Sequence, residues 1–293
     1  MFATKRLRTL LALLLAVVLV GAAAACSSSE PTVEAAPTTE EAPGTTAGTE
    51  PPGTTVPVPA SGHVAQTVEV ATAKGATVDV YQAKPGVPSS KITQPPAGRV
   101  QPIPRADLNS AGSRATDSGW QFDNPTYFGN PLVFVVEENQ GDWLKVHVPV
   151  RPNGSMGWVK ASQVTLSEHQ YAIEVSLSEA KVRAWSGSEL LGEGPVVHGA
   201  AGSPTPVGTF YINEKIPQSY AGGAYGPWIL STSAYSESME LFDNGLPVVA
   251  LHGTNQPGLL GSAVSNGCVR MQNDLVTLLA NAIPAGTPVT VTA

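Results

Sequence analysis

The sequence predicts a mainly β protein with one clear helix, and three observations support this fold class. Short runs in which apolar and polar residues alternate recur along the chain, as in strands with one buried face. Clusters of Gly, Pro, Asn and Asp separate these runs, which is typical of turns. One segment near the C-terminus has apolar residues at helical spacing. These features predict two consecutive β-rich modules, residues 63–166 and 167–293.

Residues 1–25 have the features of an export signal. Lys5, Arg6 and Arg8 form a basic start, an apolar run follows, and small residues precede Cys26. The apolar run is short for a helix that crosses a membrane. We therefore expect the mature chain to lie outside the cytoplasm.

Cys26 and the small residues before it resemble a bacterial lipobox. The resemblance implies cleavage before Cys26 and a lipid on that residue, which would anchor the protein to the outer face of the cell membrane. An ordinary secretory signal with a chance cysteine is the alternative. Residues 26–62 are rich in Pro, Thr, Ala and Glu and almost lack large apolar side chains, so we expect a disordered tether.

The first module is expected to contain four short strands, at 77–81, 131–137, 143–148 and from 157 onward. A turn is predicted at 151–154. Residues 141–164 resemble a bacterial SH3-like barrel, because W-x-x-V, a turn and G-W-V follow one another, and Trp143 and Trp158 are expected in its core. No element is predicted for the Pro-, Gly- and Ser-rich insertion at 85–119.

The second module is expected to contain six strands, at 171–177, 181–185, 190–198, 209–213, 247–252 and 287–292. Its helix is predicted by four apolar residues at helical spacing, Leu275, Leu278, Leu279 and Ile283. Asn273 is expected to cap the start of this helix, Asp274 suits its first turn, and Pro284 ends it.

The charge of the chain argues against nucleic acid as a partner. The formal net charge is −7, and no cluster of Lys and Arg exists beyond the export signal. Binding to a phosphate backbone needs such a cluster.

The chain has two cysteines, Cys26 and Cys268. If Cys26 carries lipid, Cys268 has no disulfide partner. A free thiol in an oxidising compartment is prone to oxidation, so its presence needs a reason. Nucleophilic chemistry is one such reason, and a buried structural thiol is the alternative.

The segment from His252 to Arg270 combines the groups that a cysteine nucleophile needs. His252-Gly253-Thr254 is followed by eleven residues, and Asn266-Gly267-Cys268 comes next. A nearby imidazole lowers the pKa of a thiol and carries its proton. Gly267 lets the chain turn tightly, so the amides of residues 267 and 268 could hold an oxyanion. The positive end of the helix that follows would favour the thiolate.

These residues resemble the catalytic signature of the L,D-transpeptidase family, also called the YkuD-type domain. Ser265-Asn266-Gly267-Cys268-Val269-Arg270 is similar to its Ser-His-Gly-Cys motif, with Asn266 where many members have His. Residues 204–210 resemble the T-P-x-G-x-F turn, and residues 286–289 the closing turn. About 120 residues are similar to the family in the expected order, and we identify the second module as its catalytic domain.

The resemblance implies a reaction on the peptide stems of peptidoglycan. Cys268 would attack the carbonyl between the L-centred diamino residue and the terminal D-Ala of a tetrapeptide donor. The resulting thioester would pass to the amine of a diamino residue on an acceptor stem, which gives a 3→3 cross-link. His252 would be the base. No metal and no organic cofactor are implied, and carbapenem-type β-lactams would acylate Cys268.

Further residues receive roles from the same resemblance. The amides of Gly267 and Cys268 would hold the oxyanion, and Arg270 would hold the thiolate or a substrate carboxylate. Candidates for the wall of the site are Gly253, Ser265, Asn266, Tyr225 and Trp228. In contact with the cell wall, the SH3-like module would position the enzyme or bind glycan or peptide.

Three alternatives stay open at this point. The same thioester could pass to water, which would make the protein an L,D-carboxypeptidase. The chain could also be a non-catalytic lipoprotein that binds the cell wall. A zinc site formed by His198, His252 and Cys268 lacks the close ligand pair that such sites usually have, and His198 is otherwise structural or cleft-lining.

Overall fold

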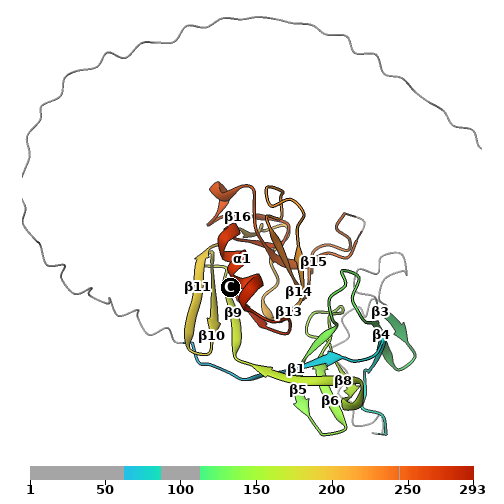
Figure 1. The fold of residues 1–293 in the computed structure, drawn as a ribbon. Helices are drawn as coiled ribbons and strands as arrows, with labels where there is room; N and C mark the ends of the chain where they lie inside the picture. The colour runs from blue at the N-terminus through green and yellow to red at the C-terminus, as the bar shows by residue number, and fades with distance from the viewer. Residues whose placement is uncertain (1–62, 87–112, 244) are drawn as a thin grey trace, which may run out of the picture. The chain divides into compact units, whose positions relative to one another are not determined.

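The computed structural model describes residues 63–86, 113–243 and 245–293. The predicted export signal, Cys26, the tether and most of the 85–119 insertion lie outside these residues. The described residues all belong to one compact unit. Its described part is mainly β with a single α-helix, which confirms the predicted fold class (Figure 1). In this part of the chain, no helix has the length and apolar character that a membrane span requires.

The first sheet is antiparallel and has eight strands in the order β3-β4-β2-β7-β6-β5-β1-β8. In chain order the strands are β1 (Val68–Ala73), β2 (Thr77–Tyr81), β3 (Ser113–Thr116), β4 (Gly119–Asp123), β5 (Val133–Asn139), β6 (Trp143–His147), β7 (Met156–Lys160) and β8 (Val164–His169). A short 3-10 helix, η3 (Ala161–Gln163), precedes β8. The four strands predicted for this module are present, and so is the turn at 151–154.

The prediction that Trp143 and Trp158 form the core of this module is wrong. Both side chains are half-buried, whereas Leu144, Val146 and Val159 are fully buried. Side chains alternate between the two faces of a strand, so burying the aliphatic set turns both tryptophans to the other face. There Lys160 lies over the ring of Trp143, and Lys84 over that of Trp158.

The second sheet has eight strands in the order β11-β10-β9-β18-β13-β14-β15-β17. In chain order these are β9 (Tyr171–Ser176), β10 (Lys181–Ser186), β11 (Glu189–Pro195), β13 (Gly208–Pro217), β14 (Trp228–Tyr235), β15 (Val248–His252), β17 (Val269–Arg270) and β18 (Pro288–Thr292). A separate parallel pair joins β12 (His198–Gly199) to β16 (Ala263–Ser265), and η4 (Pro257–Leu259) is a 3-10 turn.

The strand predicted at 190–198 is two elements. β11 ends at Pro195, and the chain continues as β12 in the separate pair. Proline has no amide hydrogen to donate to a neighbouring strand, so it is a natural end for β11. This break turns the chain away from the sheet edge and toward β16, the strand that leads to the 265–268 segment.

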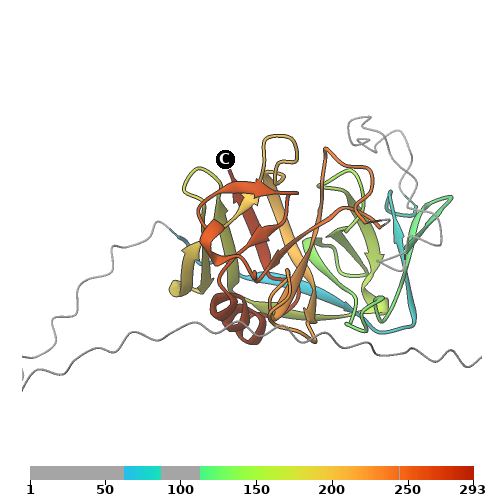
Figure 2. The ribbon, with the colours of Figure 1, turned by 90° about the horizontal axis from the view of Figure 1, so that it is seen from above.

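The two faces of the second sheet have different coverings. The helix α1 (Asn273–Ala282) packs against one face through Leu275, Val276, Leu279 and Ala280 (Figure 1, Figure 2). Val249 and Leu251 of β15 belong to this core. Val248 and Ala250 alternate with them and therefore point to the opposite face.

Asn273 does not cap α1 as predicted. Gln272 occupies the N-cap position without a side-chain hydrogen bond, and Asn273 is the first helical residue. The Asn273 Oδ1 atom instead accepts a hydrogen bond of 2.8 Å from the Thr254 amide, which follows β15 in the chain. Asp274 lies in the first turn as expected, and the helix ends before Ile283 and Pro284.

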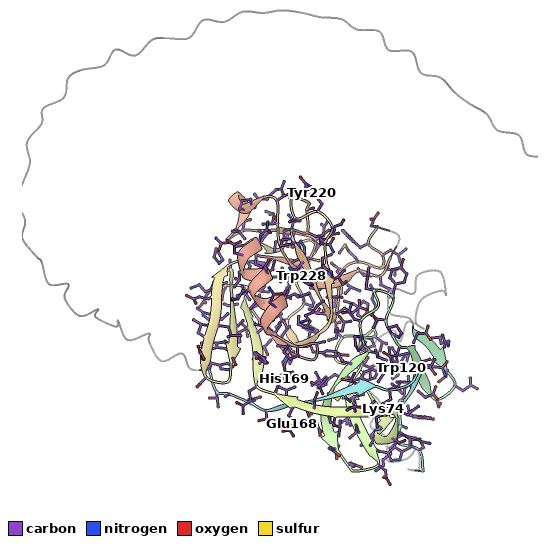
Figure 3. All side chains as sticks on the ribbon, viewed as in Figure 1. Lys74, Trp120, Glu168, His169, Tyr220 and Trp228 are labelled. Carbon is purple, nitrogen blue, oxygen red and sulfur yellow. The ribbon has the colours of Figure 1, made fainter. Side chains whose placement is uncertain are left out.

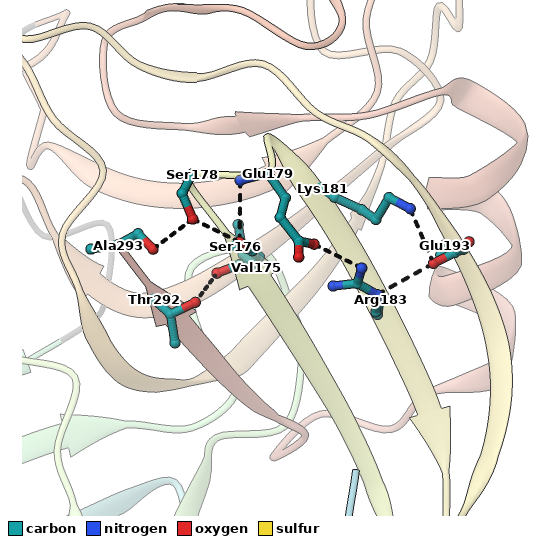
Figure 4. Close-up of polar contacts among 9 residues, drawn as sticks. All are labelled: Val175, Ser176, Ser178, Glu179, Lys181, Arg183, Glu193, Thr292 and Ala293. Atoms are coloured by element: carbon teal, nitrogen blue, oxygen red, sulfur yellow. Dashed lines mark hydrogen bonds and ion pairs between the residues drawn. The ribbon is translucent and has the colours of Figure 1, made fainter. Parts of the chain in front are cut away.

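The β9–β10 hairpin holds the C-terminal strand β18 in place, because β9 pairs with it. Thr292 Oγ1 donates to Val175 O over 3.4 Å, and Ser178 Oγ donates to Ala293 O over 3.0 Å (Figure 4). Arg183 pairs with Glu179 and Glu193 on the same surface (Figure 4). These pairs are exposed, so each adds little to stability, at most about 1 kcal/mol.

Candidate active site

A cavity of about 300 Å³ lies on the face of the second sheet that α1 does not cover. β13, β14 and β15 supply much of its wall, and Cys268 and Asn266 also line it. The first module also contributes, through Thr126, Phe128, Leu132 and Pro149. Both modules therefore shape the cavity that holds the predicted nucleophile.

Cys268 lies beside β15. Leu251 pairs with Val269 in a parallel register, so Cys268 stands next to Ala250, one residue earlier on each strand. The thiol is half-buried, and Sγ lies 3.9 Å from the Val248 carbonyl oxygen. Burial raises the pKa of the Cys268 thiol, although hydrogen bonding to Ala250 and the charge of Arg270 act in the other direction.

His252 ends β15, two residues beyond Ala250, and its side chain is only 3% exposed. Its Nδ1 atom lies 2.6 Å from the Gly253 carbonyl oxygen. A carbonyl can only accept, so Nδ1 carries the proton and Nε2 keeps its lone pair. Burial lowers the pKa of His252 from 6.5 to about 4, the charge of Arg270 acts in the same direction, and the bond to Gly253 opposes both.

The imidazole and the start of the helix were expected to lower the pKa of the Cys268 thiol, and burial raises it instead. The thiol pKa is raised and the imidazole pKa is lowered, so both groups are neutral near pH 7. The reason is that both lie where the charged forms lose hydration. The thiol of Cys268 donates a long hydrogen bond of 3.9 Å to the Val248 carbonyl oxygen.

The turn before Cys268 is fixed by side-chain hydroxyls. Ser265 Oγ accepts from the Gly267 amide at 3.1 Å and donates to the Cys268 carbonyl at 2.7 Å. Thr205 Oγ1 donates to the Gly267 carbonyl at 2.8 Å. Gly267 has φ of 109°, a conformation that side chains rarely adopt. The Gly267 amide is thus already used, which contradicts its predicted role as a free oxyanion donor.

Arg270 lies next to His252 across the β15–β17 ladder. Its amide and carbonyl are both paired with Val197 at 2.9 Å. The Nε atom is buried and has no partner among the described residues. The charge of the guanidinium acts to lower the pKa of His252 and opposes the larger effect of burial, which raises the pKa of Cys268 and of Tyr225.

The two predicted substrate-binding aromatics lie in different places. The Tyr225 ring meets the His252 ring edge-on, with centroids 4.9 Å apart, and Tyr225 also lines the cavity. Trp228, which Figure 3 labels in the second module, packs against the core of the second sheet and is not among the described residues that line the cavity. Tyr225 is therefore part of the site, whereas Trp228 meets it through its carbonyl oxygen, which accepts from the Gly253 amide.

Gly253 follows the end of β15 at a point where the backbone packs closely against neighbouring segments. A side chain at this position would collide with Gly226, Pro227 and Asn273. Its amide donates to the Trp228 carbonyl at 3.3 Å, and its carbonyl accepts from His252. Gly253 thus acts on the ring of His252 through backbone atoms.

Two polar residues in the cavity wall were not predicted. Asn213 and Glu214 lie on β13, and each has a buried oxygen without a partner among the described residues. The predicted strand at 209–213 gave no sign of them, because a Glu at its end reads as a solvent-facing residue. A carboxylate immediately after an alternating apolar run was the only signal available.

His198 lies in β12, where its Nδ1 atom is 3.2 Å from the Gly199 carbonyl oxygen. It is not among the described residues that line the cavity. Within residues 63–86, 113–243 and 245–293, no group of three or more His, Cys, Asp and Glu side chains is placed to hold a metal ion.

Comparison with known proteins gives a match over the second module. The profile of the YkuD family, an L,D-transpeptidase catalytic domain, matches residues 170–291. YkuD of Bacillus licheniformis, which is named as an L,D-transpeptidase, is 35% identical over 122 residues, and YkuD of Bacillus subtilis is 34% identical over 121 residues. The matched segments are 42% and 41% of this chain and span 66% and 65% of those relatives.

Solved structures match at lower sequence identity. L,D-transpeptidase 3 from Mycobacterium tuberculosis, in complex with a faropenem-derived adduct, has 14% sequence identity and a TM-score of 0.38, and the match covers 63% of this chain and 78% of that one. The SH3-like character of the first module lies outside the matched profile and stays a prediction. Residues 170–291 belong to the YkuD family of L,D-transpeptidase catalytic domains.

Proposed function

We propose that the protein is a peptidoglycan L,D-transpeptidase that forms 3→3 cross-links through a thioester on Cys268. The observation that supports this most is a thiol beside β15 and an imidazole at the end of the same strand, both in a domain of the YkuD family. A cavity with room for a peptide side chain adjoins the thiol.

Proton transfer starts from the neutral pair. His252 holds its Nδ1 proton on the Gly253 carbonyl, so Nε2 is the atom that accepts the proton of Cys268. The thiolate then exists only together with the imidazolium. Arg270 stabilises the thiolate and opposes the imidazolium, so its two effects on the pair partly cancel.

The acylation step consumes the donor stem. Sγ attacks the carbonyl carbon of the diamino residue, and a bond from sulfur to carbon forms. The bond from that carbon to the nitrogen of the terminal D-Ala breaks, and the imidazolium of His252 gives its proton to the leaving amine. The products of this step are free D-Ala and a thioester on Cys268.

The second step uses the amine of an acceptor stem. The amine attacks the thioester carbon, an amide bond forms, and the bond to sulfur breaks. His252 takes the proton of the attacking amine and returns it to the sulfur, which restores the neutral pair. In each step the Cys268 amide is the donor that stays available for the oxyanion, because Ser265 uses the Gly267 amide.

Arg270 binds the carboxylate of the terminal D-Ala in this proposal. Its Nε atom lacks a partner in the described residues, and its charge reaches both Cys268 and Tyr225. A carboxylate adjacent to the scissile bond would satisfy this guanidinium. The terminal residue of the donor would then need a free carboxyl group.

We place the protein outside the cytoplasm, anchored by lipid on Cys26 to the outer face of the cell membrane. The basic and apolar start of the chain and the small residues before Cys26 support this location. The tether at 26–62 would let the enzyme reach the cell wall, and the SH3-like module would bind glycan or peptide there.

Carbapenem-type β-lactams would acylate the same sulfur. Their strained cyclic amide presents a carbonyl to the thiol in place of the donor stem. The C–N bond of the ring breaks, and its nitrogen stays attached to the acyl group as an amine. The whole molecule would therefore remain on Cys268 as a thioester.

Intact-protein mass spectrometry tests this function. The chain is mixed with a tetrapeptide that ends in D-Ala, or with a carbapenem, and adducts, free D-Ala and peptide dimers are measured. One adduct per chain and cross-linked dimers are expected. Tripeptide without dimers would show that water is the acceptor.

The two cysteines provide a matched control. Cys268→Ser should abolish the thioester, and Cys26→Ser should keep it while removing the membrane anchor. An adduct that persists in Cys268→Ser, or no adduct in the native chain, would reject the proposed nucleophile.

A further inference from the structure

Glu214 is a buried carboxyl group in the same cavity as Cys268. It lies on β13, lines the cavity, and is only 5% exposed. Its Oε1 atom is buried without a hydrogen-bond partner in the described residues. The cavity thus contains a buried carboxyl oxygen to which no described residue donates a hydrogen bond.

The contacts around Glu214 leave its charge uncompensated. The Thr126 hydroxyl of the first module hydrogen-bonds its carboxyl group, and Thr126 Oγ1 also accepts from the Asn130 amide. The next residue, Lys215, turns away and donates to the Ala280 and Ile283 carbonyls at 2.9 Å. No ion pair to Glu214 occurs among the residues with described positions.

A lone buried carboxylate is costly. Burial raises the pKa of Glu214, with the Thr126 hydrogen bond opposing that effect. An unpaired carboxylate removed from water destabilises the fold unless a partner compensates it. Asn213 Oδ1, a second buried acceptor without a described partner, lies on the same cavity wall. Together they form a site for a ligand group that donates hydrogen bonds and carries positive charge.

The strand register gives the spacing between this site and the thiol. Glu214 pairs with Ser231, Ser231 pairs with Ala250, and Cys268 stands beside Ala250. All four residues line the cavity, so they form one row across the sheet. Three strand spacings of about 4.8 Å separate the backbones of Glu214 and Cys268 by about 14 Å. Both side chains shorten that span, so a ligand group several bonds from the attacked carbonyl would reach Glu214.

The wall between these two ends is apolar. Ile216, Ile229 and Val248 from the second sheet line it, and Leu132 and Phe128 from the first module add to it. Such a wall suits a chain of methylene groups. A ligand that matches the whole row has a carbonyl at one end, methylenes in the middle and an ammonium at the other end. This is the shape of a diamino residue attacked at its own carbonyl.

We propose that Glu214 selects the donor stem by binding the side-chain ammonium of its diamino residue while Cys268 attacks the carbonyl of that residue. The inference rests on the proposed function and deepens it. Asn213 provides a second acceptor for the ammonium, and Thr126 positions the carboxyl group of Glu214. The first module thereby takes part in substrate choice.

Two donor tetrapeptides that differ in one group test this inference. One has lysine at the third position, and the other has 6-hydroxynorleucine, which keeps the methylene chain but has a neutral hydroxyl. The release of D-Ala over the first turnover is measured for the full native chain, for Glu214→Gln and for Glu189→Gln, an exposed control on β11. Carbapenem acylation of each variant reports whether Cys268 and His252 remain intact.

The native chain should use the lysine peptide about 10- to 100-fold better, as expected for a hydrogen bond to a charged group. Glu214→Gln should lose that preference, with the hydroxynorleucine peptide and the carbapenem unaffected, and Glu189→Gln should keep it. Glu214→Asp, which retains the charge on a shorter side chain, should give an intermediate preference. An equal preference in native chain and Glu214→Gln would overturn the inference. Absence of any peptide or carbapenem adduct in the native chain would instead reject the proposed function.

Discussion

At the scale of single residues, the state of His252 follows from its burial. The pKa of His252 falls from 6.5 to about 4 in the fold, so folding favours the neutral ring. The stabilisation is complete above pH 6.5 and is lost as the pH falls through about 4, where the folded ring takes up its proton. The full effect is about 3 kcal/mol.

This predicts a pH-dependent difference between the native chain and His252→Asn. Between pH 7 and pH 4, the free energy of unfolding of the native chain should fall more steeply than that of the variant. Chemical denaturation across this range measures both slopes. Parallel slopes would show that His252 titrates as an exposed histidine does.

Tyr225 lies against the His252 ring. Its ring contacts the imidazole edge-on and is itself 41% exposed. Removing the ring in Tyr225→Ala should admit water and raise the pKa of His252 from about 4 toward 6.5. The acid limb of kcat/KM should then move to higher pH, because the protonated ring cannot accept the thiol proton.

Tyr225→Phe is the matched control for this prediction. It keeps the ring over His252, so the acid limb should stay where the native chain has it. The test is the pH profile of D-Ala release, measured for the native chain, Tyr225→Ala and Tyr225→Phe. A shift in Tyr225→Phe as large as that in Tyr225→Ala would assign the effect to the hydroxyl group instead.

Sequence reasoning at this scale found residue types but not hydrogen-bond directions. The spacing of His252 and Cys268 indicated a nucleophile and a base, and the register places both beside the cavity strand β15. Nothing in the pattern indicated that Ser265 uses the Gly267 amide, because a turn can point its amides inward or outward. Glu214 was missed because a residue that it contacts, Thr126, lies 88 positions earlier in the chain.

At the scale of elements, α1 supports the strand end that carries His252. Asn273, its first residue, accepts the Thr254 amide, and Thr254 is buried two residues after His252. Asn273→Ala should leave this amide unpaired and lower the free energy of unfolding by about 1–3 kcal/mol. Gln272→Ala, at the exposed N-cap position without a side-chain bond, should change it by less than about 0.5 kcal/mol. Equal losses in thermal or chemical denaturation would contradict the role of Asn273.

Element prediction succeeded where one face of a strand is apolar. Alternation identified β6 and β10 with nearly correct bounds. β14 escaped prediction because its second face carries polar groups that are buried in the fold. Ser231 lines the cavity, the Ser233 hydroxyl accepts from the Tyr211 amide, and Tyr235 donates to the Pro149 carbonyl of the first module. In the sequence alone, a strand with polar residues on a face between two modules has the same polar pattern as a loop.

At the scale of the whole molecule, the two modules share hydrogen bonds as well as the cavity. Tyr235 Oη donates to the Pro149 carbonyl at 2.8 Å. The Asn153 side chain accepts from the Tyr235 amide at 2.9 Å and donates to its carbonyl at 2.8 Å. Tyr211 Oη lies 3.4 Å from the carbonyl oxygens of Val133 and His147. The first module is therefore a structural part of the cavity in addition to any role at the cell wall.

Asn153 provides the sharpest test of this coupling. Asn153→Ala breaks both bonds to Tyr235 and loosens the cavity wall that Thr126, Phe128 and Pro149 form, while Cys268 and His252 keep their own contacts. We expect the KM for a tetrapeptide donor to rise several-fold, with kcat and the rate of carbapenem acylation within about twofold of native, because only binding to that wall is lost. Asn281→Ala, an exposed position on α1, is the control and should leave KM unchanged. If kcat fell with KM unchanged, the first module would act on the chemistry of Cys268 rather than on the fit of the donor.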